Sequence, residues 1–260
     1  MDSRSHRETS LLLAIARCPN ATTCLEQDDD GHPCHGIVAK QGADSLKRLQ
    51  LPEPWSGELT KAPILFVGSN PSISPLEEYP TGAWPDEMLI DFWLNRFAGG
   101  ARPWTKKGLY TLLRTGEYSQ RWVRYWAAVR HRAKELLQRP ARPGVDYCIS
   151  EVVHCKSRSE YGVREALKEC RDRYLSELIA VSGARVIVGL GAIAERAIRN
   201  QFDIPEQERV GGPVEHGDLL RIFAFLPHPN ARQKHFFEQC LSPPELMRVR
   251  KHLLTSDTSA

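Results

Sequence analysis

Two polar side chains follow apolar runs that have the length of strands. Asn70 lies in the turn Gly68-Ser69-Asn70-Pro71-Ser72, directly after the run 64–67. His228 lies between two prolines, directly after the run 222–226 and 158 positions beyond Asn70. An amide held at a strand end is suited to orienting a water molecule, and an imidazole there can stabilise a developing anion. Either feature alone is also an ordinary turn or strand end, but together they predict a site that the fold assembles.

Cysteine supplies a second possible chemistry. The chain has seven cysteines and no export signal, which argues against a disulfide framework. Cys155 and Cys170 are 15 positions apart, and Cys18, Cys24 and Cys34 lie near the N-terminus, but no pair has the Cys-x-x-Cys spacing. Four cysteines drawn from both ends are suited to an iron–sulfur cluster, and buried core thiols are the alternative.

Two weaker signals concern anions. A basic surplus over residues 96–142 indicates either an anion-binding face or a solvated helix face. Lys106, Lys107, Arg121 and Arg124 in this region are candidate contacts to phosphate groups. The pair Gly189-x-Gly191 at an expected strand–helix junction favours tight packing there, with a nucleotide-binding domain as the alternative.

Composition favours a globular protein that does not enter a membrane. The chain has 260 residues, of which 41% are hydrophobic and 26% charged, with a formal net charge of +3. No apolar run reaches the ~18 residues that a membrane span needs. We therefore expect a cytoplasmic monomer with no membrane partner.

The pattern of apolar residues predicts the elements that position these groups. Continuous apolar runs predict strands at 63–67, 146–153, 185–188 and 219–226. Amphipathic spacing predicts helices near 10–16, 119–138 and 162–182. Two further helices are expected, one that Asp86 caps and one that begins after Gly191. Strands alternating with helices predict the α/β class, a three-layer α/β/α fold around a central four-stranded parallel sheet. We expect a cysteine-containing segment over 1–60 packed on the core, one α/β domain over 61–253 with a helical insertion at about 75–142, and a polar tail over 254–260.

With the segment Ser150-Glu151-Val152-Val153-His154-Cys155-Lys156 added, the sequence resembles the uracil-DNA glycosylase superfamily over roughly residues 60–235. Residues 64–71 look like its first motif, in which Asn70 matches the Asp or Asn that positions the attacking water. His228-Pro229-Asn230 looks like the second motif, usually His-Pro-Ser, whose His stabilises the departing uracil anion. The resemblance is closest to the iron–sulfur branch, because Cys155 and Cys170 match its last two cluster ligands.

The resemblance implies a monofunctional DNA repair glycosylase that flips a damaged or deaminated base, uracil or a relative, and hydrolyses its N-glycosidic bond. The implied partner is single- or double-stranded DNA, and the implied cofactor is one structural 4Fe-4S cluster. Its ligands would be Cys18, Cys24, Cys155 and Cys170, with Cys34 as an alternative. Base recognition would use Gly68, Ser69, Glu151, Asn230 and a stacking ring, Trp84 first and Tyr79 second, while Arg232 or Gln233 would fill the gap in the duplex.

Three positions depart from the superfamily's pattern. The N-terminal pair is Cys18-x5-Cys24, Asn230 replaces Ser, and Glu151 stands where the superfamily has the Asn that reads uracil. An ionised Glu only accepts hydrogen bonds, so it would face uracil O4 without a donor, whereas a protonated Glu needs a pKa raised by burial. The alternative is that Glu151 takes no part in recognising the base and pairs with a nearby Arg or Lys. A protein of the same fold that binds uracil or damaged DNA without cutting is the second hypothesis, and a small-molecule enzyme is the third.

Overall fold

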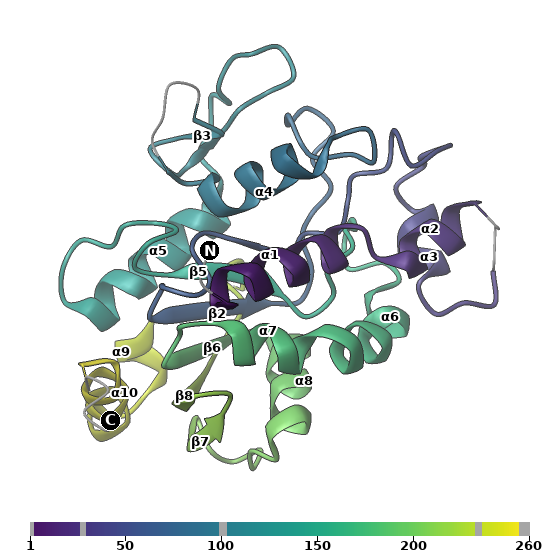
Figure 1. The fold of residues 1–260 in the computed structure, drawn as a ribbon. Coiled ribbons are helices and arrows are strands. Elements are labelled where there is room, and N and C mark those ends of the chain that lie inside the picture. Colours follow the sequence, from purple (N-terminus) through teal and green to yellow (C-terminus); the bar gives the residue numbers. More distant parts are fainter. Residues whose placement is uncertain (1–2, 27–29, 99–102, 232–235, 255–260) are drawn as a thin grey trace.

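A mostly parallel central sheet with helices packed around it organises the chain (Figure 1). The computed structural model describes residues 3–26, 30–98, 103–231 and 236–254. Within that part of the chain, six strands form the main sheet in the order β1-β5-β2-β6-β8-β7. Their bounds are Trp55–Ser56 (β1), Ile64–Gly68 (β2), Cys148–Glu151 (β5), Val186–Leu190 (β6), Val210–His216 (β7) and Leu219–Leu226 (β8). The four inner strands run parallel, and the two edge strands are antiparallel to their neighbours.

The sheet therefore has two strands more than the four-stranded parallel sheet that the sequence predicts. The four inner strands match the expected apolar runs, although β5 is shorter than 146–153. The edge strands are missed for local reasons. β1 has only two residues, and β7 contains Gly211-Gly212-Pro213, which resembles a turn. Proline and glycine are tolerated at a sheet edge because no further strand needs their hydrogen bonds.

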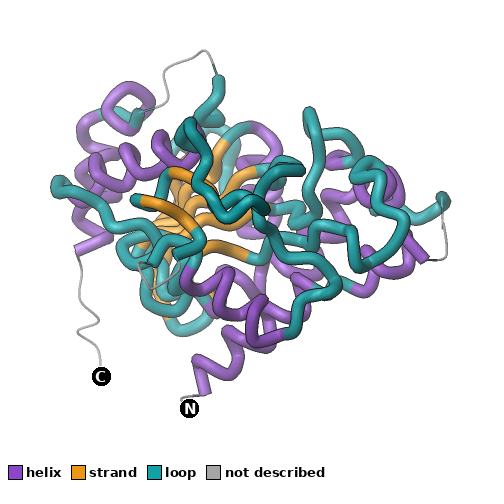
Figure 2. Tube along the Cα trace, turned by 90° about the horizontal axis from the view of Figure 1, so that it is seen from above, coloured by secondary structure: helices purple, strands orange, loops and turns teal. Residues whose placement is uncertain are grey.

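Helices cover both faces of the sheet, so the fold has three layers (Figure 2). One buried cluster joins the sheet to α1 (Ser3–Ala16), α2 (Pro19–Glu26), α3 (His35–Ala39), α4 (Asp86–Asn95), α6 (Val163–Cys170), α7 (Ser176–Val181) and α8 (Ala192–Phe202). The other joins it to α5 (Arg124–Leu137), α9 (Phe237–Cys240) and α10 (Pro243–Leu254). Within β2, Leu65 and Val67 belong to the first cluster, and Ile64 and Phe66 to the second. This two-sided burial explains why the strand is apolar at every position.

The segment 75–142 is less helical than expected. It holds α4 and α5, and between them a two-stranded ribbon of β3 (Thr105–Lys106) and β4 (Tyr110–Thr111). Asp86 is the first residue of α4 and not its cap, because Pro85 occupies the N-cap position. The helix expected at 119–138 begins only at Arg124. The helix expected at 162–182 is present, with a π-helical turn at Arg171–Leu175 between α6 and α7.

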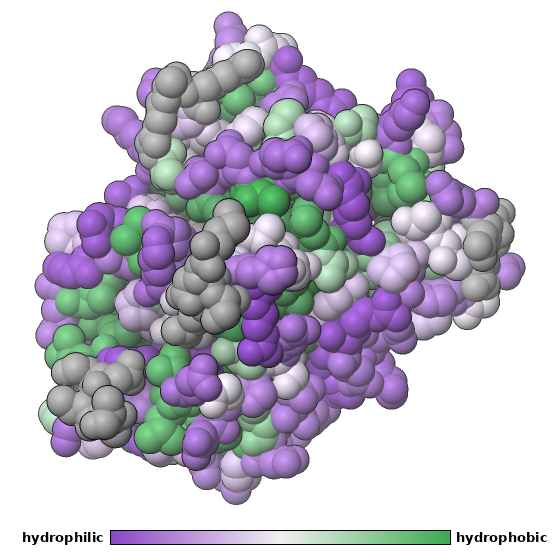
Figure 3. Space-filling view, in the orientation of Figure 1, coloured by the Kyte–Doolittle hydropathy of each residue, from purple (hydrophilic) through white to green (hydrophobic). Residues whose placement is uncertain are grey.

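The surface drawn in Figure 3 is mostly hydrophilic, with apolar residues gathered over α9 and α10. Met247 and Leu254 of α10 are 68% and 80% exposed. In the described part of the chain, no helix combines the length and apolar character required to cross a membrane. Residues 255–260 of the expected polar tail lie outside the described residues.

Candidate functional site

The carboxyl ends of the parallel strands meet at one edge of the sheet. Gly68, the last residue of β2, pairs with Glu151, the last residue of β5. On the other side, the end of β6 pairs with Leu226, the last residue of β8. The loop with Asn70 follows the first of these strands, and Pro227-His228 follows the last. Ligands of open α/β sheets bind at such an edge.

A cavity of about 440 Å³ opens at this edge, and both Asn70 and His228 line it. Its volume is in the range of small-molecule sites, about 300–1,000 Å³. Ser69, Glu151 and Asn230 line the same cavity. The fold thus brings five of the predicted site residues together. Residues that the sequence analysis did not single out complete the wall: Glu53, Glu77, Arg96, Tyr125, Trp126, Lys156 and Glu160 among them.

The side chain of Asn70 is held by its own loop. Its Nδ2 donates a hydrogen bond to the carbonyl of Pro71 at 2.9 Å, so the Oδ1 end remains as an acceptor. That oxygen lies 3.5 Å from the Ser69 hydroxyl, which donates its closer hydrogen bond, at 2.9 Å, to Oε1 of Glu160. The arrangement presents an amide oxygen that can hold a water but cannot take a proton from it.

His228 is held as a neutral hydrogen-bond donor. Its Nδ1 accepts a hydrogen bond from the backbone N–H of Asn230 at 3.2 Å, so the neutral ring carries its proton on Nε2. Burial lowers the pKa of His228, an effect that the charge of Glu160 opposes and that of Arg132 reinforces. The imidazole stacks on Tyr125 with 5.6 Å between ring centroids. Arg132 donates to the carbonyl of Pro227 at 2.9 Å and so fixes the residue before the imidazole.

Glu151 is buried beside Gly68 without a compensating cation. A Cβ at Gly68 would overlap Oε2 of Glu151 and lie 2.8 Å from the Tyr125 hydroxyl, so only glycine permits this approach. Burial raises the pKa of Glu151 well above its ordinary value, and the negative charge of Glu53 adds to this, while the Tyr125 hydroxyl acts in the opposite direction. No ion pair within the described residues involves Glu151. Pairing with a nearby cation is therefore not how this chain uses the residue, and burial favours the neutral form of its carboxyl group.

A buried network of charged side chains forms part of the cavity lining. Arg96 donates to Oε1 of Glu53 at 2.8 Å and to Oε1 of Glu77 at 2.7 Å. Lys156 lies 4.0 Å from Oε2 of Glu53 and over the ring of Tyr79. Burial would raise the pKa of Glu53, but the charges of Arg96 and Lys156 outweigh it and the pKa is lowered. These charges are spread over residues 53–156, so no local sequence motif identifies them.

The predicted stacking rings lie elsewhere. Trp84 packs against Trp104 and Phe92, at 5.5 and 5.7 Å between ring centroids, and does not line the cavity. Tyr79 is 2% exposed and donates its hydroxyl to Glu53 at 3.0 Å. Tyr125 and Trp126, at the start of α5, are the aromatic residues that line the cavity. Their position beside the basic Arg124 is the signal in the sequence that could have identified them.

The predicted phosphate contacts lie on the segment that forms one wall of the cavity. Lys106, Lys107, Arg121 and Arg124 are exposed. None of them lines the cavity itself, but Thr111, Val123, Tyr125 and Trp126 of the same segment do. The four cations therefore lie outside the cavity, on the segment that contributes to its lining. Arg232 and Gln233 lie outside the described residues.

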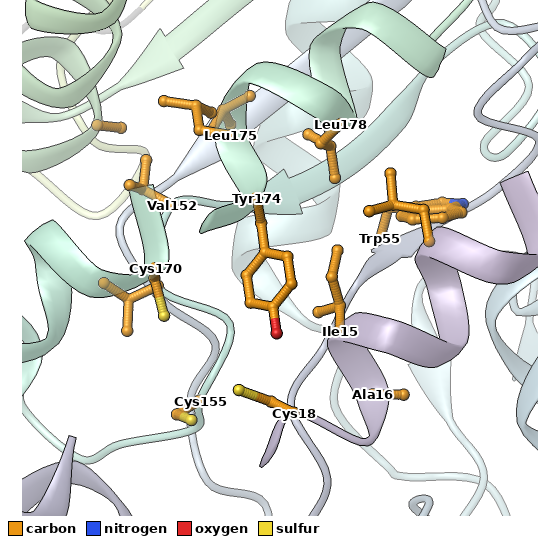
Figure 4. Packing of buried hydrophobic residues seen from close by; sticks show 14 of the residues in the cluster. Ile15, Ala16, Cys18, Trp55, Val152, Cys155, Cys170, Tyr174, Leu175 and Leu178 are labelled. Carbon is orange, nitrogen blue, oxygen red and sulfur yellow. The ribbon is translucent and has the colours of Figure 1, made fainter. Parts of the chain in front are cut away.

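Five cysteines gather where the N-terminal helices meet the loop after β5. All are buried, and Figure 4 shows Cys18, Cys155 and Cys170 around the hydroxyl of Tyr174. Burial raises the pKa of Cys155, and the neighbouring thiols of Cys18, Cys34 and Cys24 raise it further. A hydrogen bond with Cys170 raises the pKa of Cys34. In the described part of the chain, no group of three or more Cys, His, Asp or Glu is arranged to bind a metal ion.

No protein-family model matches the sequence, and no curated protein matches it. The geometry and chemistry of the cavity therefore carry the functional argument.

Proposed function

We propose that the chain is a DNA glycosylase that takes a flipped, deaminated base into this cavity and hydrolyses its N-glycosidic bond. The observation that carries the proposal is the meeting of Asn70 and His228 on one cavity at the carboxyl edge of the sheet. The resemblance of the two loops to the motifs of the uracil-DNA glycosylase superfamily supports the same activity. Base release needs a donor for the departing base and a held water, and these two residues supply them.

His228 stabilises the departing base. As the bond between the anomeric carbon and the base nitrogen breaks, its electron pair moves onto the base, and negative charge grows on the acceptor next to that nitrogen, which is O2 in uracil and the ring nitrogen N3 in hypoxanthine. The Nε2–H of His228 donates to this acceptor. Because the imidazole is neutral before the reaction, the hydrogen bond strengthens as the charge develops.

Neutral Glu151 is suited to read a lactam edge. A protonated carboxyl group offers one acceptor and one donor side by side. Uracil presents its N3–H and O4 in the complementary order, and hypoxanthine presents its N1–H and O6 in the same way. Hydrolytic deamination creates this edge from the amino-bearing edges of cytosine and adenine, so the substrate class is a deaminated base.

DNA reaches the cavity along the insertion. Lys106, Lys107, Arg121 and Arg124 are placed to contact phosphate groups, and Tyr125 or Trp126 offers a face on which the flipped base or its neighbour stacks. Such stacking contributes ~1–3 kcal/mol per base, which offsets the few kcal/mol that flipping costs. Neutralised phosphates make the affinity for DNA fall with rising salt concentration.

The five gathered cysteines suit a cluster of iron and sulfur by their donor type and burial, although in the described residues they are not arranged as its ligands. Thiolates are the ligands of such clusters. Cys155 with Cys18, Cys24 and Cys34 or Cys170 would hold it. When bound, the cluster fastens the N-terminal helices to the sheet and supplies no chemistry to base release.

Oligonucleotides that each carry one uracil, hypoxanthine, xanthine or ethenocytosine test the proposal. After incubation and alkali treatment, strand cleavage reports release of the base. We expect cleavage at uracil and hypoxanthine and none at ethenocytosine, which has no ring N–H. We expect N70A and H228A to remain folded and to lose about 10²-fold or more in rate. A gel shift without cleavage on every substrate would instead identify a protein that binds damaged DNA without cutting it.

A further inference from the structure

One acidic side chain of the cavity has no place in the reaction as described so far. Glu160 lies in the loop between β5 and α6 and lines the cavity together with Asn70 and His228. The backbone of this loop is unusual, because both Ser159 and Glu160 have positive φ angles, 54° and 57°. Two consecutive residues other than glycine in the left-handed region cost free energy, and such strain persists where the surrounding structure imposes it.

The strained loop places the carboxyl group of Glu160 against the first motif. Its Oε1 accepts a hydrogen bond from the Ser69 hydroxyl at 2.9 Å, across 91 positions of sequence. Ser69 is the neighbour of Asn70, and its hydroxyl is 3.5 Å from Oδ1 of that residue. The Asn70 amide oxygen and the Glu160 carboxylate therefore lie on either side of one hydroxyl group.

The reaction needs a proton acceptor beside the water. A water that Asn70 holds must lose a proton when its oxygen bonds to the anomeric carbon. A neutral amide does not take up that proton, and the Nδ1 of His228 is occupied by the N–H of Asn230. Glu160 is an acidic side chain that the Ser69 hydroxyl connects to Asn70.

We propose that Glu160 is a further catalytic residue, the general base that accepts the proton of the water held by Asn70. The inference rests on the proposed glycosylase function. In the step, the C1′–N bond breaks and its electron pair leaves with the base. The water oxygen forms the new bond to C1′, and one water proton passes to the Glu160 carboxylate. The side chain is exposed, so it returns that proton to solvent and is ready for the next turnover.

The negative charge of the Glu160 carboxylate has a second effect on the reaction, because it acts on the sugar of the flipped nucleotide. The sugar becomes cation-like as the base departs, and a carboxylate close to it lowers the energy of that state. An Asn at position 70 supplies no charge of its own. Glu160 restores from a neighbouring loop the charge that an Asp at position 70 would carry.

The test uses the full chain and a single-turnover assay on uracil-containing oligonucleotide. In E160Q the amide oxygen still accepts the Ser69 hydrogen bond, but the side chain no longer takes a proton. We expect the rate of base release to fall about 10²-fold with unchanged affinity for DNA. E165Q removes the same charge from an exposed position on α6 outside the cavity, and we expect it to retain the wild-type rate.

A second variant separates chemistry from packing. In E160A, added formate can occupy the vacated space and accept the proton, so we expect formate to raise the rate of E160A and not that of the wild type. E160Q at the wild-type rate, or E160A that formate does not restore, would overturn the role of Glu160 while leaving the glycosylase proposal intact. Absence of base release by the wild type on all four bases would remove the glycosylase proposal, and this role with it.

Discussion

The raised pKa of Glu151 predicts how the stability of the protein depends on pH. Glu151 is 6% exposed, and burial followed by the charge of Glu53 raises its pKa in the folded state. In the unfolded chain the carboxyl group has its ordinary pKa. Between these two values, the folded state binds one proton more than the unfolded state. The free energy of unfolding contributed by this group therefore decreases as pH rises through that window, and the loss is complete above the folded pKa.

The substitution Glu151→Gln removes this dependence and keeps nearly the same shape and one donor and one acceptor. The expected difference follows from the single proton. Relative to the wild type, the variant gains about 1.4 kcal/mol in free energy of unfolding for each pH unit within the window. The two proteins should differ least near pH 4.5, the ordinary value for this group, and most at neutral to alkaline pH.

Denaturant unfolding of both proteins at pH 5, 6, 7 and 8 measures the difference. Other groups that titrate in this range are shared by the two chains, so their contributions cancel in the comparison. Glu165→Gln, an exposed carboxyl group, serves as the matched control and should give a curve parallel to the wild type. A constant difference between Glu151→Gln and the wild type across the four pH values would mean that Glu151 is ionised in the folded protein. The proposal that a neutral Glu151 reads the lactam edge of the base would then be wrong.

Three further substitutions test other parts of the structure. Gly68→Ala places a methyl group against Glu151 and the Tyr125 hydroxyl, so thermal or denaturant unfolding should show a loss of ~1–3 kcal/mol together with loss of base release. Arg96→Met removes the cation that bonds both Glu77 and Glu53 and leaves Glu53 with Lys156 at 4.0 Å alone, so the same measurement should show a loss of about 3–5 kcal/mol. Cys155→Ala removes the thiol at the centre of the cysteine group, so protein purified without oxygen should lose its bound iron and visible absorbance. Equal iron content in variant and wild type would exclude a cluster on Cys155.

The sequence predicts the inner sheet well because burial on both faces leaves a continuous apolar run. Residues 64–67 and 219–226 show this directly, and each run becomes a strand at nearly the expected bounds. The carboxyl ends of these strands then place Asn70 and His228 at one edge without further information. The outer strands escape prediction because an edge strand needs neither length nor continuous apolarity, as the two residues of β1 and the glycines and proline of β7 show.

Aromatic residues were the least predictable part of the site. Tryptophan can serve equally as core or as a stacking surface, and its sequence neighbours do not decide between the two. Trp84 packs in a cluster with Trp104 and Phe92. Tyr125, the second residue of α5, instead stacks on His228. The choice depends on how the insertion folds over the sheet, which is a tertiary property.

The two glutamates of the cavity lie in very different surroundings. Glu151 lies at the end of an inner strand, buried against Gly68, where a carboxyl group loses its hydration and remains protonated. Glu160 lies on an exposed loop, where it accepts a hydrogen bond from the Ser69 hydroxyl. Environments that differ this much let one residue type act as a hydrogen-bond donor to the base and as an acceptor for the proton of the water. In the proposed mechanism, exchanging the burial of the two positions would abolish both roles, so the depth of each side chain in the cavity, and not its identity, would separate recognition from catalysis.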